Sequence, residues 1–242
     1  PTVVLGSVRL SGREFEPIAA HARHSYLRYS FTKGTGQEVA FLVEALGLAA
    51  GARVLDVGCG PGRHVRGLAG AGLRAVGADL SHAFLAAAGT GPWARADARS
   101  LPFPPGCFDA AISICQGGFG LLGGDDDALV VGEMARVLRP GGRLALSAFS
   151  AYFAVRHLEE GDTFHADAGV NHERATVLDA GGAPAEFDLW TTCFTPRELR
   201  LIAARAGLEV RGLWSVAPGR YAARPPDLEH PEWLVLAEKP PV

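Results

Sequence analysis

Short apolar runs alternate with amphipathic segments between residues 53 and 149, and this alternation constrains the fold more than any other feature of the chain. Four runs have the length and composition of buried strands: 53–57, 75–78, 108–114 and 143–149. Segments with helical spacing of apolar residues lie between them, at 63–71, 81–88 and 125–138. Short apolar strands connected by helices form parallel sheets that helices cover on both faces. The sequence therefore predicts an α/β fold.

The segments on either side of this region follow other patterns. Residues 14–50 have helical spacing with a break at Lys33–Gly36, and residues 150–170 are irregular. Residues 173–193 predict a β-hairpin with Gly181–Gly182 at its turn. Thr195, Pro196 and Glu198 predict a helix start with a capping box, and the helix ends near Gly207. Two last strands are expected at 208–214 and 233–237.

The first strand runs directly into a glycine-rich turn. Val54–Arg63 reads VLDVGCGPGR, a strand, then glycines at alternate positions, then a helix. Glycines there let the backbone approach a ligand closely, and the helix start offers free N–H groups. The dinucleotide-binding fingerprint has its third glycine one place later, where this chain has Arg63. The spacing therefore favours a ligand without a pyrophosphate.

Three aspartates are expected at the carboxyl ends of three successive strands. Asp56 precedes the glycine turn and Asp79 ends the strand at 75–78. Asp97, in the segment 94–103, is expected to end a further strand that precedes the run at 108–114. In open α/β sheets these strand ends meet at the topological switch point, where ligands bind. A carboxylate at Asp79 can accept both hydroxyls of a ribose, and Asp97 with the neighbouring N–H can contact an adenine edge. The three acids therefore predict one nucleoside-binding crevice.

These segments resemble the successive motifs of the class I S-adenosylmethionine-dependent methyltransferases, of the methyltransferase type 11 kind. The resemblance rests on VLDVGCGPGRH, VGADLS, ARADARSLPFPPGCFDAAISI and ARVLRPGGRLALSAF, over roughly residues 40–150. It implies a Rossmann-like three-layer sandwich with a mostly parallel seven-stranded sheet and an antiparallel last strand. N-terminal helices and a small β insertion would complete a single domain. We divide it into a helical cap (1–50), a cofactor core (51–149), a substrate lid (150–194) and a part that completes the sheet (195–242).

The resemblance also implies S-adenosylmethionine as cofactor and a set of residues that bind it. Asp56 and the 58–62 turn would lie near its methionine part, Asp79 at the ribose, Asp97 and Ala98 at the adenine, and Cys115 and Gln116 along the floor. The full expected set is Tyr29, Asp56, Gly58, Cys59, Gly60, Gly62, Asp79, Leu80, Ser81, Asp97, Ala98, Arg99, Cys115 and Gln116. Tyr26, His165 and His172 are the residues we expect to contact the substrate. No metal site and no identifiable catalytic base are expected.

Composition limits the partners. The net charge is −3, which gives no electrostatic footprint for a phosphate backbone, so nucleic acid is an unlikely partner on this ground. The Pro-Cys and Asp/Asn-Pro-Pro-Tyr signatures of two groups of nucleic-acid methylases are absent. No signal peptide and no apolar span long enough for a bilayer are visible, which favours a cytoplasmic protein. The four cysteines form no CxxC pair and are expected to be free thiols.

The predicted reaction is in-line methyl transfer to a small-molecule acceptor. Residues 14–36 and 150–193 are expected to form the substrate lid. Three alternatives remain open: a methyltransferase acting on RNA or protein, a nicotinamide-dependent oxidoreductase, and a non-catalytic module that binds S-adenosylmethionine. The sequence identifies neither the acceptor atom nor the oligomeric state.

Overall fold

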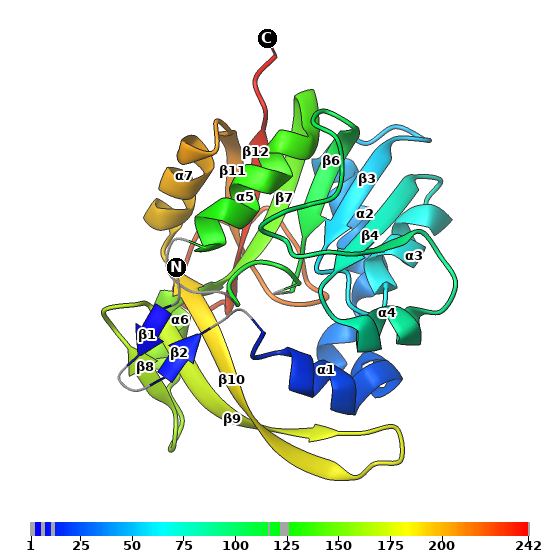
Figure 1. The fold of residues 1–242 in the computed structure, drawn as a ribbon. Coiled ribbons are helices and arrows are strands. Elements are labelled where there is room, and N and C mark those ends of the chain that lie inside the picture. The colour runs from blue at the N-terminus through cyan, green and yellow to red at the C-terminus, as the bar shows by residue number, and fades with distance from the viewer. Residues whose placement is uncertain (1–2, 6–7, 11–12, 116, 122–125, 242) are drawn as a thin grey trace.

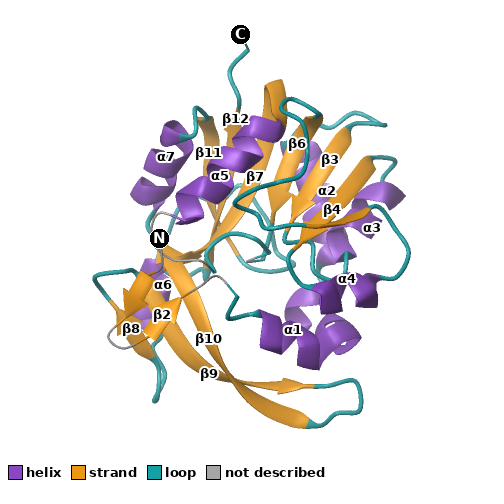
Figure 2. Cartoon of the chain, in the orientation of Figure 1, coloured by secondary structure: helices purple, strands orange, loops and turns teal. Residues whose placement is uncertain are grey.

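A seven-stranded, mostly parallel sheet forms the centre of the computed structural model (Figures 1 and 2). The structure describes residues 3–5, 8–10, 13–115, 117–121 and 126–241. The strand order is β5-β4-β3-β6-β7-β12-β11, and only β12 runs against its neighbours. The strands are β3 (Arg53–Val57), β4 (Arg74–Asp79), β5 (Trp93–Arg95), β6 (Phe108–Ser113), β7 (Leu138–Ser150), β11 (Glu209–Val216) and β12 (Glu232–Glu238). The predicted fold class is confirmed.

Helices cover both faces of this sheet, as the apolar composition of its strands requires. On one face α5 (Asp126–Val137) and α7 (Pro196–Arg205) bury Met134 and Leu199 in a core with Leu55 and Leu144. On the other face α2 (Thr35–Ala45) and α3 (Arg63–Gly70) bury a second core. The short helix α4 (His82–Ala88) lies beside β4 and β5 (Figure 1). The result is a three-layer sandwich.

A long β-hairpin extends from the end of β7. It consists of β9 (Val170–Leu178) and β10 (Pro184–Phe194), and β8 (Thr163–His165) pairs along β9. The last residues of β10 pair in parallel with Phe149 and Ser150 of β7, so the hairpin continues the central sheet into a ten-stranded one. Figure 1 shows the hairpin curving away from the sheet and passing beneath α1. The predicted hairpin is present, with its turn at 179–183.

The N-terminal segment departs from the helix expected between residue 14 and the break at Lys33–Gly36. It contains a small pair of strands, β1 (Val3–Leu5) and β2 (Val8–Leu10), then α1 (Glu16–Ala22) and the 3₁₀ turns η1 (Arg23–Arg28) and η2 (Ser30–Thr32). The helix fails after Ala22 because Arg23 adopts a left-handed backbone, with φ of 45°. The Ser25 hydroxyl also donates to the carbonyl oxygen of Ala22 at 2.6 Å, a local bond that competes with helix bonds.

The segment after β7 also contains more regular structure than the sequence indicated. Ser150 ends β7 and caps α6 (Ala151–Arg156), its hydroxyl accepting the N–H of Phe153 at 3.1 Å. We had expected residues 150–170 to be irregular, because a six-residue helix is too short to show a period. The helix start at Thr195 has the predicted capping box with Glu198. Among the described residues, no helix has both the length and the apolar composition to cross a bilayer.

Candidate active site

The glycine turn after β3 forms one wall of a pocket at the carboxyl ends of the parallel strands. Gly58 has φ of 73°, and a Cβ there would lie 1.7 Å from the carbonyl carbon of Gly117. A side chain at Gly58 is therefore excluded by both the backbone conformation and the neighbouring loop. Gly60 also has a left-handed backbone, but a Cβ there would meet only Phe84, at 3.9 Å. Gly60 therefore presents bare backbone to the cavity that it lines.

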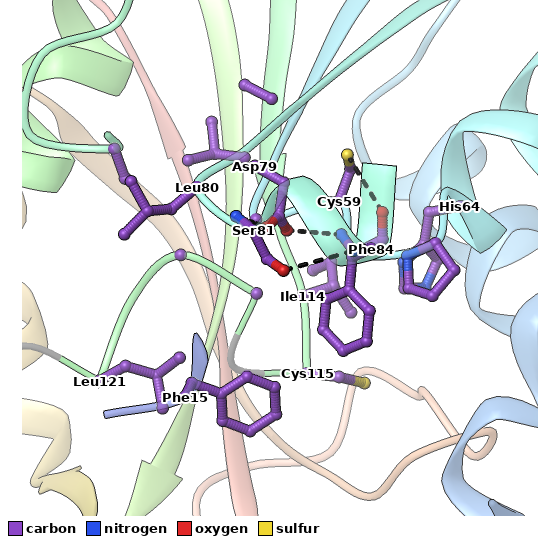
Figure 3. Close-up of a pocket in the computed structure, with 18 of the residues that line it drawn as sticks. Phe15, Cys59, His64, Asp79, Leu80, Ser81, Phe84, Ile114, Cys115 and Leu121 are labelled. Atoms are coloured by element: carbon purple, nitrogen blue, oxygen red, sulfur yellow. Dashed lines mark hydrogen bonds between the residues drawn. The ribbon is translucent and has the colours of Figure 1, made fainter. Parts of the chain in front are cut away.

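Asp79, at the end of β4, connects the glycine turn to the start of α4 on a second wall of the pocket. Its carboxylate accepts the N–H of Gly60 and the N–H of Ser81, each at 2.7 Å (Figure 3). Ser81 in turn caps α4, its hydroxyl accepting the N–H of Phe84. Burial raises the pKa of Asp79, and the two backbone hydrogen bonds oppose that rise. Each carboxylate oxygen keeps a further lone pair, so Asp79 can stabilise the turn and still accept a ligand hydroxyl.

Asp97 and Ala98 line the same pocket beyond the end of β5. The Asp97 carboxylate forms a bidentate pair with Arg99, with Nε–Oδ1 and Nη2–Oδ2 distances of 2.9 and 2.6 Å. These hydrogen bonds from Arg99 lower the pKa of Asp97. Arg99 also reaches Asp126 on α5, so its guanidinium links two acids and does not line the cavity. Arg99 therefore influences the pocket only indirectly, by holding the Asp97 carboxylate in place and keeping it ionised.

The floor of the pocket is at the end of β6, where Ile114 and Cys115 meet Gly117 and Gly118. Cys115 has φ of 53°, an unusual backbone for a residue other than glycine. Its N–H donates to the Ser147 hydroxyl at 2.8 Å, which fixes the bend. Burial raises the pKa of the Cys115 thiol, so the neutral thiol lines the floor. Backbone strain of this kind is concentrated at functional sites in folded proteins.

Aromatic rings from the N-terminal segment close the pocket opposite the glycine turn. Phe15, Tyr26 and Phe31 line the cavity together with Phe84 of α4 (Figure 3 labels Phe15 and Phe84). The Tyr26 ring packs on Phe84 and Phe31, with centroid distances of 4.9 and 5.3 Å. Burial raises the pKa of the Tyr26 hydroxyl, which stays protonated. This face of the pocket is apolar apart from that hydroxyl and Glu16.

The hairpin supports the aromatic wall from outside. The Ser25 hydroxyl, whose hydrogen is shared with the Ala22 carbonyl, lies 2.7 Å from the carbonyl oxygen of Leu178, and the Leu178 N–H donates to the Tyr29 hydroxyl at 3.0 Å. His21 Nε2 lies 3.2 Å from the carbonyl oxygen of Val177. The N-terminal segment and the hairpin tip therefore form one bonded unit.

The pocket gathers most, but not all, of the residues expected from the sequence. Those that line it are Tyr26, Gly58, Cys59, Gly60, Asp79, Leu80, Ser81, Asp97, Ala98 and Cys115. Gln116 lies outside the described residues. Tyr29 does not line the cavity, because its hydroxyl faces the hairpin. Gly62 does not line it either; a Cβ there would lie 2.4 Å from the Trp93 ring, so this glycine serves packing.

Asp56 lies beside the pocket and does not line it. It is 2% exposed, and its Oδ2 atom has no hydrogen-bond partner among the described residues. Burial raises the pKa of this carboxyl to about 7. The expected arrangement of three acids around one cavity is therefore replaced by two acids lining it and a third buried next to it.

His165 and His172 do not line the cavity. Both rings stack on Trp190, with centroid distances of 5.9 and 3.8 Å, and His172 Nε2 pairs with Asp188 at 2.8 Å. These residues belong to β8, β9 and β10. Our expectation that they contact the substrate gains no support from their position.

Sequence reasoning missed Arg63, whose side chain lines the pocket and forms an ion pair with Glu38 on α2. It also missed Phe15, Phe31 and Phe84, which occur in segments without a recognisable motif. The helical spacing around Glu38 showed a buried face, and a lone glutamate on such a face was the signal that could have identified the pair.

Comparison with known proteins agrees with this geometry. Residues 55–146 match a family model described as a methyltransferase domain. This match covers well under half of the chain. The matched segment includes the glycine turn, Asp79, Asp97 and the pocket floor.

Individual relatives share this core. A demethylmenaquinone methyltransferase from Mycolicibacterium vanbaalenii is 43% identical over 109 residues, which are 44% of this chain and 46% of that protein. The chain thus matches a little under half the length of this curated relative. The CcbJ methyltransferase from Streptomyces caelestis has a similar fold, with a TM-score of 0.74 at 20% identity, covering 92% of this chain and 98% of that one.

The SAM-bound CalS10, an amino pentose methyltransferase from Micromonospora echinaspora, has a TM-score of 0.61 at 23% identity. The similarity covers 89% of this chain and 95% of that one. Both likenesses of fold therefore extend well beyond residues 55–146.

Proposed function

We propose that the chain binds S-adenosylmethionine in this pocket and transfers its methyl group to a small-molecule acceptor. The observation that carries the proposal is the convergence of Gly58–Gly60, Asp79–Ser81 and Asp97–Ala98 on one cavity. The donor and acceptor groups fit the cofactor. Gly60 leaves room for a ligand where a Cβ would project, and Asp79 retains lone pairs for ribose hydroxyls.

Each part of the pocket then has a role. Asp79 accepts the ribose hydroxyls, Leu80 and Ala98 flank the adenine, and the turn at Gly58–Gly60 lies under the methionine part. When bound, the sulfonium supplies an electrophilic methyl group. The chain holds the acceptor atom in line with that methyl group and excludes water, and positioning of this kind can contribute about 7–11 kcal/mol.

The acceptor enters, on this proposal, along the aromatic wall of Phe15, Tyr26 and Phe31. The N-terminal segment and the hairpin form the lid, because hydrogen bonds join the hairpin to the segment that carries Phe15, Tyr26 and Phe31. An apolar wall with one hydroxyl suits an acceptor with an apolar ring system, and the menaquinone precursor in the relative's name belongs to that class. No catalytic base is assigned.

A methyl-transfer assay tests the proposal. Purified protein is incubated with S-adenosylmethionine and, separately, with reduced naphthoquinones, phenols, amines, bulk RNA and a protein mixture, and S-adenosylhomocysteine is measured. We expect turnover with a small ring-bearing acceptor. Methylation of RNA or protein alone would contradict the acceptor class. Binding of the cofactor without turnover on any acceptor would favour a non-catalytic module.

A further inference from the structure

Among the described residues that line the pocket, Arg63 is the one cation, and the other charged side chains are acids. It is the first residue of α3, directly after the glycine turn, and its side chain is 11% exposed. The other charged side chains that line the cavity are those of Glu16, Asp79 and Asp97, since buried His64 has its pKa lowered by burial and is neutral at pH 7. A ligand carboxylate in this pocket therefore has one favourable place, at Arg63.

The guanidinium has donors to spare. Its Nη1 donates to the Thr35 hydroxyl at 2.8 Å and to the Glu38 carboxylate, and its Nη2 lies 3.0 Å from the sulfur of Cys115. A guanidinium carries five N–H donors. Three are engaged with these described partners, so two remain, the number that a carboxylate accepts in a bidentate pair. The contact with Cys115 places Arg63 at the pocket floor.

Glu38 fixes the position of that guanidinium. It is 0% exposed on α2, and its Oε2 accepts both Arg63 and His64 Nε2, the latter at 2.8 Å. Its Oε1 accepts the N–H of Gly219 at 2.8 Å. Burial alone would raise the pKa of Glu38, but the hydrogen bond from His64 and the charge of Arg63 lower it below its ordinary value, so it stays ionised.

The negative charge of Glu38 is directed away from the cavity. Its side chain does not line the pocket, and its carboxylate is shared among Arg63 and His64 at the start of α3 and the backbone N–H of Gly219. Glu38 therefore orients Arg63 without competing for the two remaining donors. Loss of such an anchor would leave a long flexible side chain free to adopt other rotamers.

We propose that Arg63 binds the carboxylate of the ligand's amino-acid part, and that Glu38 is the positioning residue that aims it. This inference rests on the proposed function, because it takes S-adenosylmethionine as the ligand. The bound ligand then lies with its nucleoside end at Asp79 and Asp97, as the resemblance implies, and with its carboxylate at Arg63, beside Cys115.

The test compares two ligands that differ in the amino-acid part. Calorimetric titration measures binding of S-adenosylhomocysteine, which carries the carboxylate, and of 5′-methylthioadenosine, which lacks it. We expect R63M to weaken S-adenosylhomocysteine binding about 10- to 100-fold, the range for hydrogen bonds between charged groups, and to change 5′-methylthioadenosine binding less than about twofold. R63K keeps the positive charge but loses the planar pair of N–H donors, so its affinity for S-adenosylhomocysteine should lie between those of wild type and R63M.

E38Q should show the same ligand selectivity with a smaller loss, because Arg63 remains but is less well held. R74M is the matched control, since Arg74 is exposed at the other end of β4 and should leave both affinities unchanged. Unchanged binding of 5′-methylthioadenosine also reports that each variant is folded.

Three results would overturn the proposal. Equal weakening of both ligands in R63M would make Arg63 a structural residue, and unchanged binding of both would remove it from the site. If the wild-type protein binds neither ligand, the proposed function is wrong and so is this inference. The wild-type titration shows this before any variant is made.

Discussion

At the scale of single residues, the site depends on polar groups that serve the fold and the ligand together. Asp79 is the clearest case, because its two oxygens hold the glycine turn and the start of α4. Sequence position alone predicted that Asp79, Asp97 and the glycines would converge, since parallel strand ends share one edge. It could not predict that Arg99 would engage Asp97, or that Arg63 would meet Glu38, because periodicity shows a buried face and does not identify partners.

Asp79→Asn should weaken both binding and folding. The amide replaces one acceptor oxygen with a donor, so the N–H of Gly60 or of Ser81 loses its buried partner. We expect about 1–3 kcal/mol lower stability to denaturant and at least tenfold weaker binding of S-adenosylmethionine. Urea unfolding and calorimetry measure the two effects. Unchanged affinity would show that Asp79 supports the turn only.

Glu232 should make stability depend on pH. It is 3% exposed, its Oε2 has no hydrogen-bond partner among the described residues, and burial raises its pKa to about 7. Between the ordinary carboxyl pKa and 7 the folded chain holds a proton that the unfolded chain has lost. Stability therefore falls as pH rises through that window, by at most about 1.4 kcal/mol per pH unit for one such group. Asp56 acts in the same direction.

Glu232→Gln isolates this contribution. The variant has no ionisable group at this position, so the fall in melting temperature between pH 5.5 and pH 8 should be smaller than in wild type. Thermal denaturation at both pH values is the measurement. An identical pH dependence in variant and wild type would show that Glu232 does not titrate as its burial indicates.

At the scale of elements, the sequence predicted the positions of strands best where glycine bounds an apolar run. It predicted short helices and strands worst. Strands β3, β4, β6 and β7 could be located because glycines and charges end each run. Helix α6 has six residues, and β1 and β2 have three each, so none is long enough to show a repeating pattern of apolar residues. The junction of β10 with β7 joins residues more than 40 positions apart, and no local pattern indicates it.

Tyr29→Phe tests the contact between the N-terminal segment and the hairpin. Removing the hydroxyl leaves the Leu178 N–H without its acceptor, so the hairpin tip should loosen and residues 179–183 should be cleaved faster in limited proteolysis. Cofactor affinity should stay within about twofold of wild type, because this side chain does not line the pocket. A large loss of affinity would instead support the cofactor contact first expected for Tyr29.

Thr195→Ala is a control that alters the start of a helix and leaves the lining of the pocket unchanged. The capping box of α7 satisfies orphan N–H groups at the helix start, and its loss costs about 1 kcal/mol in comparable helices. Urea unfolding should show this decrease while S-adenosylmethionine affinity stays unchanged. A change in affinity would mean that α7 is coupled to the pocket.

At the scale of the whole molecule, a core that matches a methyltransferase domain is combined with a hairpin and an N-terminal segment that are hydrogen-bonded to each other. The core supplies the strand ends that line the pocket, while the N-terminal segment contributes aromatic rings to its lining and the hairpin supports that segment. Cores of this kind host many substrates, so the acceptor depends on the added segments and not on the fold. The resemblance to known motifs predicted the core well because those motifs are local; the N-terminal segment and the hairpin contain no such motif.

The central claim is that this pocket binds S-adenosylmethionine. Isothermal titration of the purified chain with the cofactor, and separately with NAD⁺, tests it most directly. The account predicts saturable binding of one S-adenosylmethionine per chain, at least tenfold weaker in Asp79→Asn, and no binding of NAD⁺. No heat with S-adenosylmethionine at millimolar concentration, or preferential binding of NAD⁺, would contradict it.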